Sequence, residues 1–375
     1  MDFVSSKTFC RPTLSSHTTS LLLFAIGIVV LGVIGGYFYF QKTTAPRMIE
    51  ICETDKKPVS VTLVGDLLIG GGGVWRQIVS DNYDPEKLLG ETYIYFKNSD
   101  LIFGNFEGII TEATTTREKD LPPSFSLRTD PSIVNFFSSF PRFVLSFANN
   151  HSADFGFTGI NDTLRVLENT HIGYVGIGKN SDEATTPRII EIGGVRIAFL
   201  AFTDLLPEEY YATAAKEGIA RLSPENLKEA IKKAREISDF VIVSIHTAAD
   251  VNAVPFRASD DHERFFSRLA VTEGADIVVG HQPPILQEVE KFGNGIIFYS
   301  LGIFLYDPTV SSRYPPDHPL FNGTQFKGGG ILRLEICDRK LFDYDLIPTR
   351  MVYHDHQLRL QSVSPIKYFL EGLRW

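Results

Sequence analysis

The hydrophobic pattern of the chain begins with one long apolar run. Residues 21–40, LLLFAIGIVVLGVIGGYFYF, are twenty residues without a charge. A helix needs about 20 apolar residues to cross the bilayer core, and the YFYFQ end lacks the small residues of a signal-peptide cleavage site. The pattern predicts an uncleaved transmembrane anchor, preceded by a short tail over residues 1–20 and followed by a polar linker over residues 41–58.

After the linker, short apolar runs alternate with amphipathic stretches. Bounded runs rich in β-branched residues predict buried strands, here over residues 59–65, 100–107, 143–150, 188–192, 195–202, 239–246, 275–281, 295–302, 330–336 and 341–347. Helical spacing of apolar residues, with capping residues at the ends, predicts helices over residues 157–170, 223–237 and 258–274. The alternation predicts an α/β domain over residues 59–350, with a C-terminal extension over residues 351–375.

Charge and cysteine content narrow the class of protein. The formal net charge of −9 does not suit a nucleic-acid-binding surface, which is basic. Cys10, Cys52 and Cys337 form no CxxC pair, so a thiolate zinc site is not expected. Cys52 and Cys337 both follow the apolar run and could pair if that side is oxidising. Two unpaired thiols are an alternative of at least equal weight.

Residues able to bind a metal ion follow several of the predicted strands. Ligand sites of α/β folds form at the carboxyl ends of strands. Each residue alone has a structural explanation, such as a turn, a helix cap or a hydrogen-bonded imidazole. As a set, carboxylate, amide and imidazole groups suit a divalent ion such as Mn, Fe or Zn. The set comprises Asp66, Asn105, Glu107, Asn149, Asn150, His151, His246 and His281.

These residues belong to an ordered series of motifs. The motifs are VGD (64–66), GNFE (104–107), NNHSADFG (149–156), HTAAD (246–250), GHQPP (280–284) and YSLGIF (299–304). Over residues 59 to about 307 the chain resembles the CapA/PgsA family of capsule and poly-γ-glutamate synthesis proteins. The resemblance implies a fold of the calcineurin-like phosphoesterase superfamily, a metallophosphatase-like four-layer αββα sandwich.

The resemblance also implies roles for individual residues. The implied metal ligands are Asp66, Glu107, Asn150, His246 and His281. His151 would be the general acid, and Asp154, three residues on, would orient its ring. Other site-lining residues would be Asn105, Asn149, Asp250 and Gln282. The implied cofactor is one or two divalent ions, of Mn, Fe or Zn, which activate a water molecule and stabilise developing negative charge.

Four positions depart from the patterns that the resemblance provides. Pro284 stands where the family has a second histidine, and Ile303 where it has asparagine. Leu68 occupies the histidine position of the DxH motif of ordinary phosphoesterases, and Asp250 replaces a glutamate. These departures predict that one metal position is weakened or empty.

Two functions remain open from the sequence. The first is a metal-dependent, phosphoesterase-like hydrolase at the cell surface that serves an anionic capsule polymer. The second is a non-catalytic, membrane-tethered assembly or binding subunit of a polymer synthesis and export complex. A general periplasmic nucleotidase is disfavoured because DxH and the final histidine are missing. The resemblance implies other capsule or poly-γ-glutamate synthesis membrane proteins as partners.

The expected location is the cell membrane, with a single span and the large C-terminal domain outside the cytoplasm. The basic residues flanking the span are nearly balanced, with Lys7 and Arg11 before it and Lys42 and Arg47 after it. The positive-inside rule therefore gives little help, and the orientation expected is the usual one for one N-terminal span.

Overall fold

The computed structural model describes residue 52 and residues 57–70, 73–117, 126–247, 258–306, 328–354 and 357–362. The predicted anchor over residues 21–40 lies outside the described residues. Within the described ranges, no helix has the length and apolar character needed to cross a membrane.

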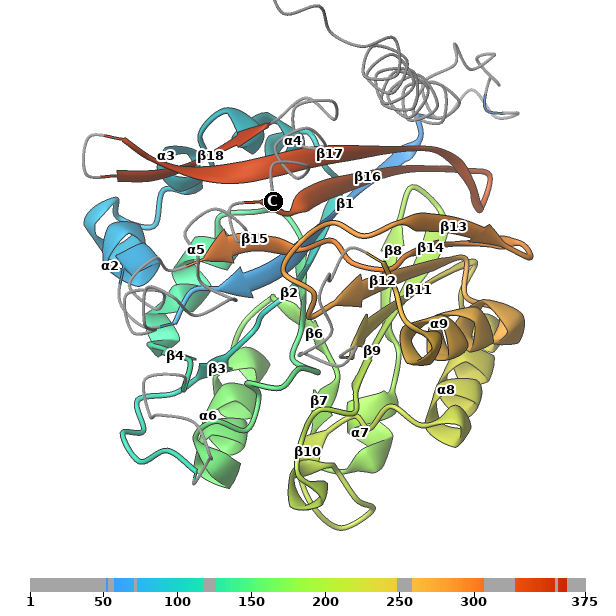
Figure 1. Ribbon diagram of the computed structural model, residues 1–375, viewed down its shortest axis with the longest axis horizontal. Helices are drawn as coiled ribbons and strands as arrows, with labels where there is room; N and C mark the ends of the chain where they lie inside the picture. The colour runs from blue at the N-terminus through green and yellow to red at the C-terminus, as the bar shows by residue number, and fades with distance from the viewer. Residues whose placement is uncertain are drawn as a thin grey trace, which may run out of the picture. The chain divides into compact units, whose positions relative to one another are not determined.

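The first sheet has eight strands in the order β18-β17-β16-β1-β2-β5-β6, with β15 also pairing β1 (Figure 1). Strands β15, β1, β2, β5 and β6 are parallel, whereas β16, β17 and β18 are antiparallel additions. The bounds are β1 (Val59–Leu68), β2 (Leu101–Asn105), β5 (Phe143–Ser146), β6 (Gly173–Val175), β15 (Ile303–Tyr306), β16 (Gly330–Cys337), β17 (Lys340–His354) and β18 (Gln357–Ser362).

The second sheet has six strands in the order β13-β14-β12-β11-β9-β8. Its four inner strands are parallel, and an antiparallel hairpin closes each edge. Gly193 and Gly194 form the turn of one of these hairpins, between β8 and β9. The bounds are β8 (Arg188–Ile192), β9 (Val195–Thr203), β11 (Phe240–His246), β12 (Ile277–His281), β13 (Val289–Phe292) and β14 (Gly295–Phe298).

Helices and short elements fill the connections. The helices are α2 (Gly73–Ser80), α3 (Pro85–Leu89), α4 (Tyr93–Lys97), α5 (Val134–Ser138), α6 (Gly156–Glu168), α7 (Ser181–Thr185), α8 (Pro224–Ile237) and α9 (Asp261–Glu273). The short strands are β3 (Ile109–Ile110), β4 (Arg128–Thr129), β7 (Ile177–Gly178) and β10 (Gly218–Ile219). Three short 3₁₀ turns are η1 (Gly90–Thr92), η3 (Pro131–Ile133) and η4 (Glu208–Tyr210).

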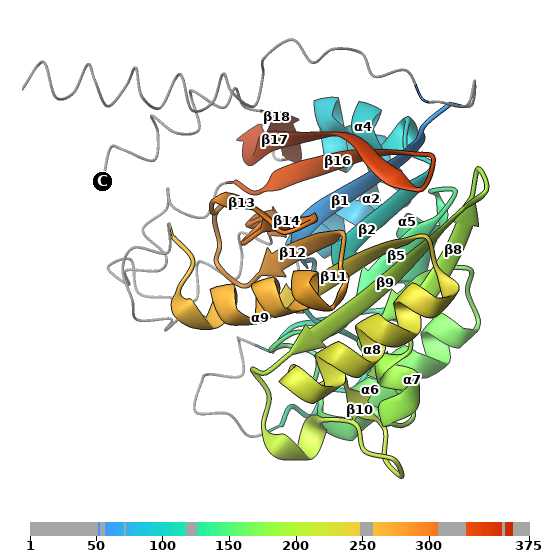
Figure 2. The ribbon, with the colours of Figure 1, turned by 90° about the vertical axis from the view of Figure 1, so that its right-hand side faces the viewer.

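The two sheets face each other across a buried apolar layer. Phe103 on β2 stacks on Phe199 on β9, with ring centroids 5.3 Å apart. The outer face of the second sheet is covered by α8 and α9, whose buried residues pack on β11 and β12 (Figure 2). On the first sheet, Phe96 of α4 packs against Phe304 of β15. The predicted α/β domain with layered sheets is confirmed.

The predicted α8 illustrates why these residues form a helix. The Ser223 hydroxyl accepts a hydrogen bond from the Asn226 N–H, and Pro224 starts the helix where its missing N–H costs nothing. Apolar residues at helical spacing then bury one face on the sheet, while the charged face stays in solvent.

A disulfide joins Cys52 to Cys337 at the end of β16, with Cα atoms 5.9 Å apart. It links the segment just after residue 51 to the first sheet. Of the two arrangements left open by the sequence, the structure has the paired one.

Candidate metal centre

The carboxyl ends of four parallel strands bring the candidate side chains together. On the first sheet, Asp66 of β1 is in register with Asn105 of β2. On the second sheet, His246 of β11 is in register with His281 of β12. Because the sheets face each other with these ends on the same side, the four side chains form one buried cluster.

Asp66 lies at the centre of the cluster. Its Oδ1 accepts hydrogen bonds from His281 Nδ1 at 2.8 Å and from Asn105 Nδ2 at 2.9 Å. Its Oδ2 accepts from the backbone N–H of Gln282 at 3.2 Å. Burial opposes ionisation, but the hydrogen bond and charge of His281 outweigh it and lower the pKa of Asp66. Asp66 is therefore a carboxylate at neutral pH.

His246 is held as a neutral imidazole. Its Nδ1 lies 3.0 Å from Asn105 Nδ2, which can only donate, so Nδ1 accepts. Its Nε2 then donates to Gln282 Oε1 at 2.7 Å and to Asn150 Oδ1 at 3.1 Å. Burial lowers the pKa of His246 to about 4. A neutral imidazole is the form that binds metal ions.

Gln282 reaches both halves of the cluster from a strained backbone. Its φ of 95° lies in the left-handed region, which side chains other than glycine rarely occupy. In this conformation its N–H meets Asp66 and its side chain meets His246. Strain of this kind gathers at functional sites.

Glu107 lies close enough to Asp66 to interact with its charge, and His151 lies beside Glu107. Burial, followed by the negative charge of Asp66, raises the pKa of Glu107 well above its usual value. His151 Nε2 lies 3.6 Å from Glu107 Oε1. His151 Nδ1 donates to Asp154 Oδ2 at 2.8 Å, which leaves Nε2 turned toward Glu107.

Asn149 supports the cluster from behind. Its Nδ2 donates to the Phe106 carbonyl at 2.8 Å and to Asn105 Oδ1 at 3.3 Å. Its Oδ1 accepts from the backbone N–H of His151 at 3.1 Å. Asn149 therefore positions Asn105 and His151. Asp250 lies outside the described residues.

Two glycines allow the strand ends to come this close. A Cβ on Gly65 would collide with the Gly302 carbonyl, and a Cβ on Gly280 would collide with the Tyr299 carbonyl. The Gly302 carbonyl also accepts a hydrogen bond from the Asp66 N–H at 2.9 Å. The YSLG part of the last motif is thus the packing partner of the GD and GH motifs.

The part of the chain that carries these motifs is similar to known proteins. The family profile described as "Bacterial capsule synthesis protein PGA_cap" matches residues 60–308. The chain belongs to this family. It is 30% identical over 294 residues to the capsule biosynthesis protein CapA of Bacillus anthracis, covering 76% of this chain and 69% of that protein. It is also 30% identical over 271 residues to the PGA biosynthesis protein CapA of Bacillus subtilis, covering 71% and 69%.

Among solved structures, the calcineurin-like phosphoesterase YfkN from Bacillus subtilis is 13% identical, with a TM-score of 0.37. The similarity covers 83% of this chain and 92% of that chain.

Three of the positions that depart from the motifs, Leu68, Pro284 and Ile303, lie close together in the fold. Leu68 and Ile303 are buried in one small apolar cluster with Leu127. The Ile303 N–H donates to the Pro284 carbonyl at 3.4 Å. Ile303 also pairs with Asp66 across β1 and β15. One flank of Asp66 is therefore apolar, and the polar cluster lies on the other.

The donor chemistry fits a divalent cation. His281 is buried and its Nε2 has no hydrogen-bond partner, while its Nδ1 is occupied by Asp66. A buried nitrogen without a partner is costly, and a cation would satisfy it. Among the described residues, no three His, Cys, Asp or Glu side chains stand in the arrangement of a metal site. Among the candidate ligands, Asp66 instead hydrogen-bonds His281, and Asn150 hydrogen-bonds His246.

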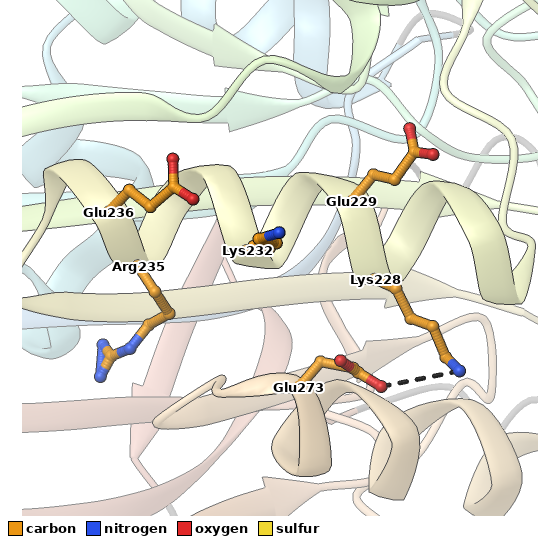
Figure 3. A pocket seen from close by; sticks show the side chains of 6 residues that line it. All are labelled: Lys228, Glu229, Lys232, Arg235, Glu236 and Glu273. Carbon is orange, nitrogen blue, oxygen red and sulfur yellow. Dashed lines mark ion pairs between the residues drawn. The ribbon is translucent and has the colours of Figure 1, made fainter.

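A surface hollow of about 390 Å³ lies elsewhere, on the outer face of α8 and the end of α9. Figure 3 shows its charged side chains, with Lys228 Nζ 3.7 Å from Glu273 Oε1. Alternating charges on an outer helix face are typical of solvated surface. The hollow shares no residue with the candidate metal centre.

Proposed function

We propose that this PGA_cap protein is a membrane-anchored, extracytoplasmic hydrolase of phosphoesterase type that acts on an anionic capsule polymer or its precursor. The observation that carries the proposal is the buried Asp66–His281 pair with the free Nε2 of His281. A carboxylate and a free imidazole nitrogen in one buried cluster are the donors that a borderline divalent ion prefers.

Asp66, Glu107, Asn150, His246 and His281 would hold the cation, which would be Mn, Fe or Zn. When bound, it would supply a water molecule of lowered pKa and compensate negative charge that develops on the substrate. Burial and the negative charge of Asp66 raise the pKa of Glu107 well above its usual value. Binding a cation beside Glu107 should lower this pKa and favour release of a proton.

The apolar flank formed by Leu68, Leu127 and Ile303 supports a site for one ion. None of these side chains can ligate a cation, and Pro284 beside them cannot either. A two-ion arrangement would need donors at this flank.

His151 would act as the general acid. Asp154 accepts a hydrogen bond from His151 Nδ1, which fixes the orientation of the ring and its tautomer. Nε2 is the atom that faces Glu107 and the cluster. It is therefore the atom that would donate a proton to a leaving oxygen.

The test is hydrolysis of a panel of phosphoesters and peptide-bond substrates by the purified chain loaded with Mn, Fe or Zn. We expect His151→Ala to lower kcat roughly 10²- to 10⁴-fold while the metal content stays unchanged. Asp154→Asn should lower kcat less. Loaded wild-type protein that hydrolyses nothing in the panel would contradict the proposal.

A second candidate function is a non-catalytic assembly subunit that works with other capsule synthesis membrane proteins and holds the polymer. The apolar replacement of donor positions at Leu68 and Ile303 favours it. Metal-free protein that stays folded and still supports polymer production in cells would select this second function.

The Cys52–Cys337 disulfide supports the extracytoplasmic location, because disulfides persist in oxidising compartments. We expect external protease to digest the domain in intact cells without prior lysis. Digestion only after lysis would place the domain inside.

A further inference from the structure

Two arginines contact the segment that carries His151 and Asp154. The Arg117 N–H donates to the Asp154 carbonyl at 3.0 Å. The N–H of Leu127, which precedes Arg128, donates to Asp154 Oδ2 at 2.7 Å. The backbone of Asp154 is therefore bonded to Arg117, and its carboxylate, which accepts from His151, is bonded to the residue before Arg128.

Aromatic rings support both guanidinium groups. The Arg117 guanidinium lies over the Tyr210 ring, 5.6 Å from its centroid, and that of Arg128 lies over Phe155 at 5.8 Å. Phe155 belongs to the NNHSADFG segment itself. A guanidinium stacked on a ring keeps its edge N–H groups available for a planar oxyanion.

Neither arginine is neutralised by a carboxylate in the described ranges, where Arg128 makes only a 3.4 Å hydrogen bond to the Thr111 carbonyl. The Nε of Arg117 is buried and has no hydrogen-bond partner. By contrast, Arg196, Arg264 and Arg268 on the second-sheet side are each paired with an acidic residue. Positive charge is thus left uncompensated beside the candidate acid of a chain whose net charge is −9.

A purely structural role is the competing explanation. The two stacked guanidinium groups would then clamp the NNHSADFG segment by packing alone, and their charge would be incidental. The free Nε of Arg117 argues against this, because packing does not require a buried donor to be left unpaired.

We propose that Arg117 and Arg128 bind an acidic group of the substrate, a carboxylate or a phosphate, and position the substrate beside His151. They are positioning residues, not catalytic ones. The inference rests on the proposed function of the site, since it names the residues that recognise the substrate there. A bidentate contact with an oxyanion would give the guanidinium groups an anionic partner, which they lack among the described residues.

The test measures binding to the metal-free full chain by calorimetry, at low and moderate salt. The probes are a glutamate oligomer of about ten residues, as a carboxylate source, and inorganic pyrophosphate, as a phosphate source; a probe of this length spans several charged groups. Arg117→Gln and Arg128→Gln should each weaken binding of the recognised probe roughly 10- to 100-fold. Arg117→Lys should retain part of the affinity, because it keeps the charge and loses the planar fork.

Arg196→Gln is the matched control, since this arginine is exposed and paired with Asp239. It should bind like wild type. Loss of affinity for the glutamate oligomer alone assigns a carboxylate, and loss for pyrophosphate alone assigns a phosphate. Folded Arg117→Lys and Arg128→Gln proteins that bind both probes with wild-type affinity would overturn the inference, as would an equal loss in Arg196→Gln.

The kinetic readout separates this inference from the proposed function. Where the loaded chain hydrolyses a substrate, the arginine variants should raise KM and leave kcat within about twofold. Hydrolysis with an unchanged KM in the arginine variants would contradict the arginine inference and leave the proposed function standing. Binding that depends on the arginines, without any hydrolysis, would support the arginine inference and contradict the proposed function.

Discussion

Asp66 and His281 lie in direct contact although 215 positions separate them in the chain, with Asp66 Oδ1 2.8 Å from His281 Nδ1. Both side chains are buried. Because an unpaired buried polar group is costly, this contact is central to the stability of the cluster and to the cation site proposed there.

Removing His281 should therefore destabilise the metal-free protein. His281→Ala leaves the buried Asp66 carboxylate without the hydrogen bond from His281 Nδ1, and we expect the free energy of unfolding to fall by about 1–3 kcal/mol. Urea denaturation in the presence of a chelator measures it. The control is His262→Ala, which removes a half-exposed partner of Asp204 and should cost no more than about 1 kcal/mol. Equal losses in the two variants would contradict the role given to the buried pair.

Gly280→Ala tests the close approach of the strands. The new methyl group would overlap the Tyr299 carbonyl, so β12 or its neighbour must shift. We expect a loss of about 1–3 kcal/mol, measured as a lower Tm. Ser244→Ala, in the adjacent strand, removes a buried hydroxyl that has no partner and should leave Tm unchanged or raise it. A Gly280→Ala protein as stable as Ser244→Ala would show that the approach is not tight.

Much of the fold is local enough to be predicted from the sequence. Strands β1, β11 and β12 are buried runs with abrupt polar ends, and their predicted bounds differ from the observed ones by a few residues. The Ser223 cap and Gly274 mark the start of α8 and the end of α9 as expected. The motif series likewise indicated which side chains gather, because parallel strands deliver their carboxyl ends to one edge.

Other features depend on contacts that no local pattern records. The predicted strand 295–302 ends at Phe298, and the chain then turns and enters the other sheet as β15 from Ile303. Both pieces are apolar, so periodicity could not separate them. Strand β17 also continues through the predicted boundary at residue 350. The short helices α2 to α5 have too few turns to show a helical period.

The apolar cluster beside Asp66 cannot be predicted from local sequence patterns either. Leu68, Leu127 and Ile303 come from three distant segments. Leu68 and Ile303 each depart from a motif in the sequence, but only the fold shows that they pack together.

Ile303→Asn tests whether the stability of the fold requires an apolar side chain at this flank of Asp66. The amide would be buried beside Leu68 and Leu127 without a partner, and we expect a loss of about 1–3 kcal/mol in unfolding free energy. The conservative Ile303→Val should cost about 0.5–1.5 kcal/mol. An asparagine variant that keeps wild-type stability and binds additional metal would mean that this flank is a donor position after all.

Glu263 predicts a pH dependence away from the metal centre. Burial, opposed by its hydrogen bond to the Asp260 N–H, raises the pKa of Glu263 to about 7. Between pH 4.5 and 7 the unfolded chain has lost this proton while the folded chain keeps it, so stability should fall as pH rises through this window. Glu263→Gln keeps the cap of α9 and should lack this component. The measurement is the difference in Tm between wild type and Glu263→Gln across that pH range; a constant difference would contradict the raised pKa.

The metal content of the purified protein tests the account most directly. Elemental analysis after loading and dialysis should find about one Mn, Fe or Zn ion per chain, in a site of carboxylate, amide and imidazole donors. Asn150→Ala and His246→Ala should lose that ion and remain folded, while His262→Ala should keep it. Folded wild-type protein that retains none of the three metals would contradict the claim that Asp66, His246 and His281 form a cation site.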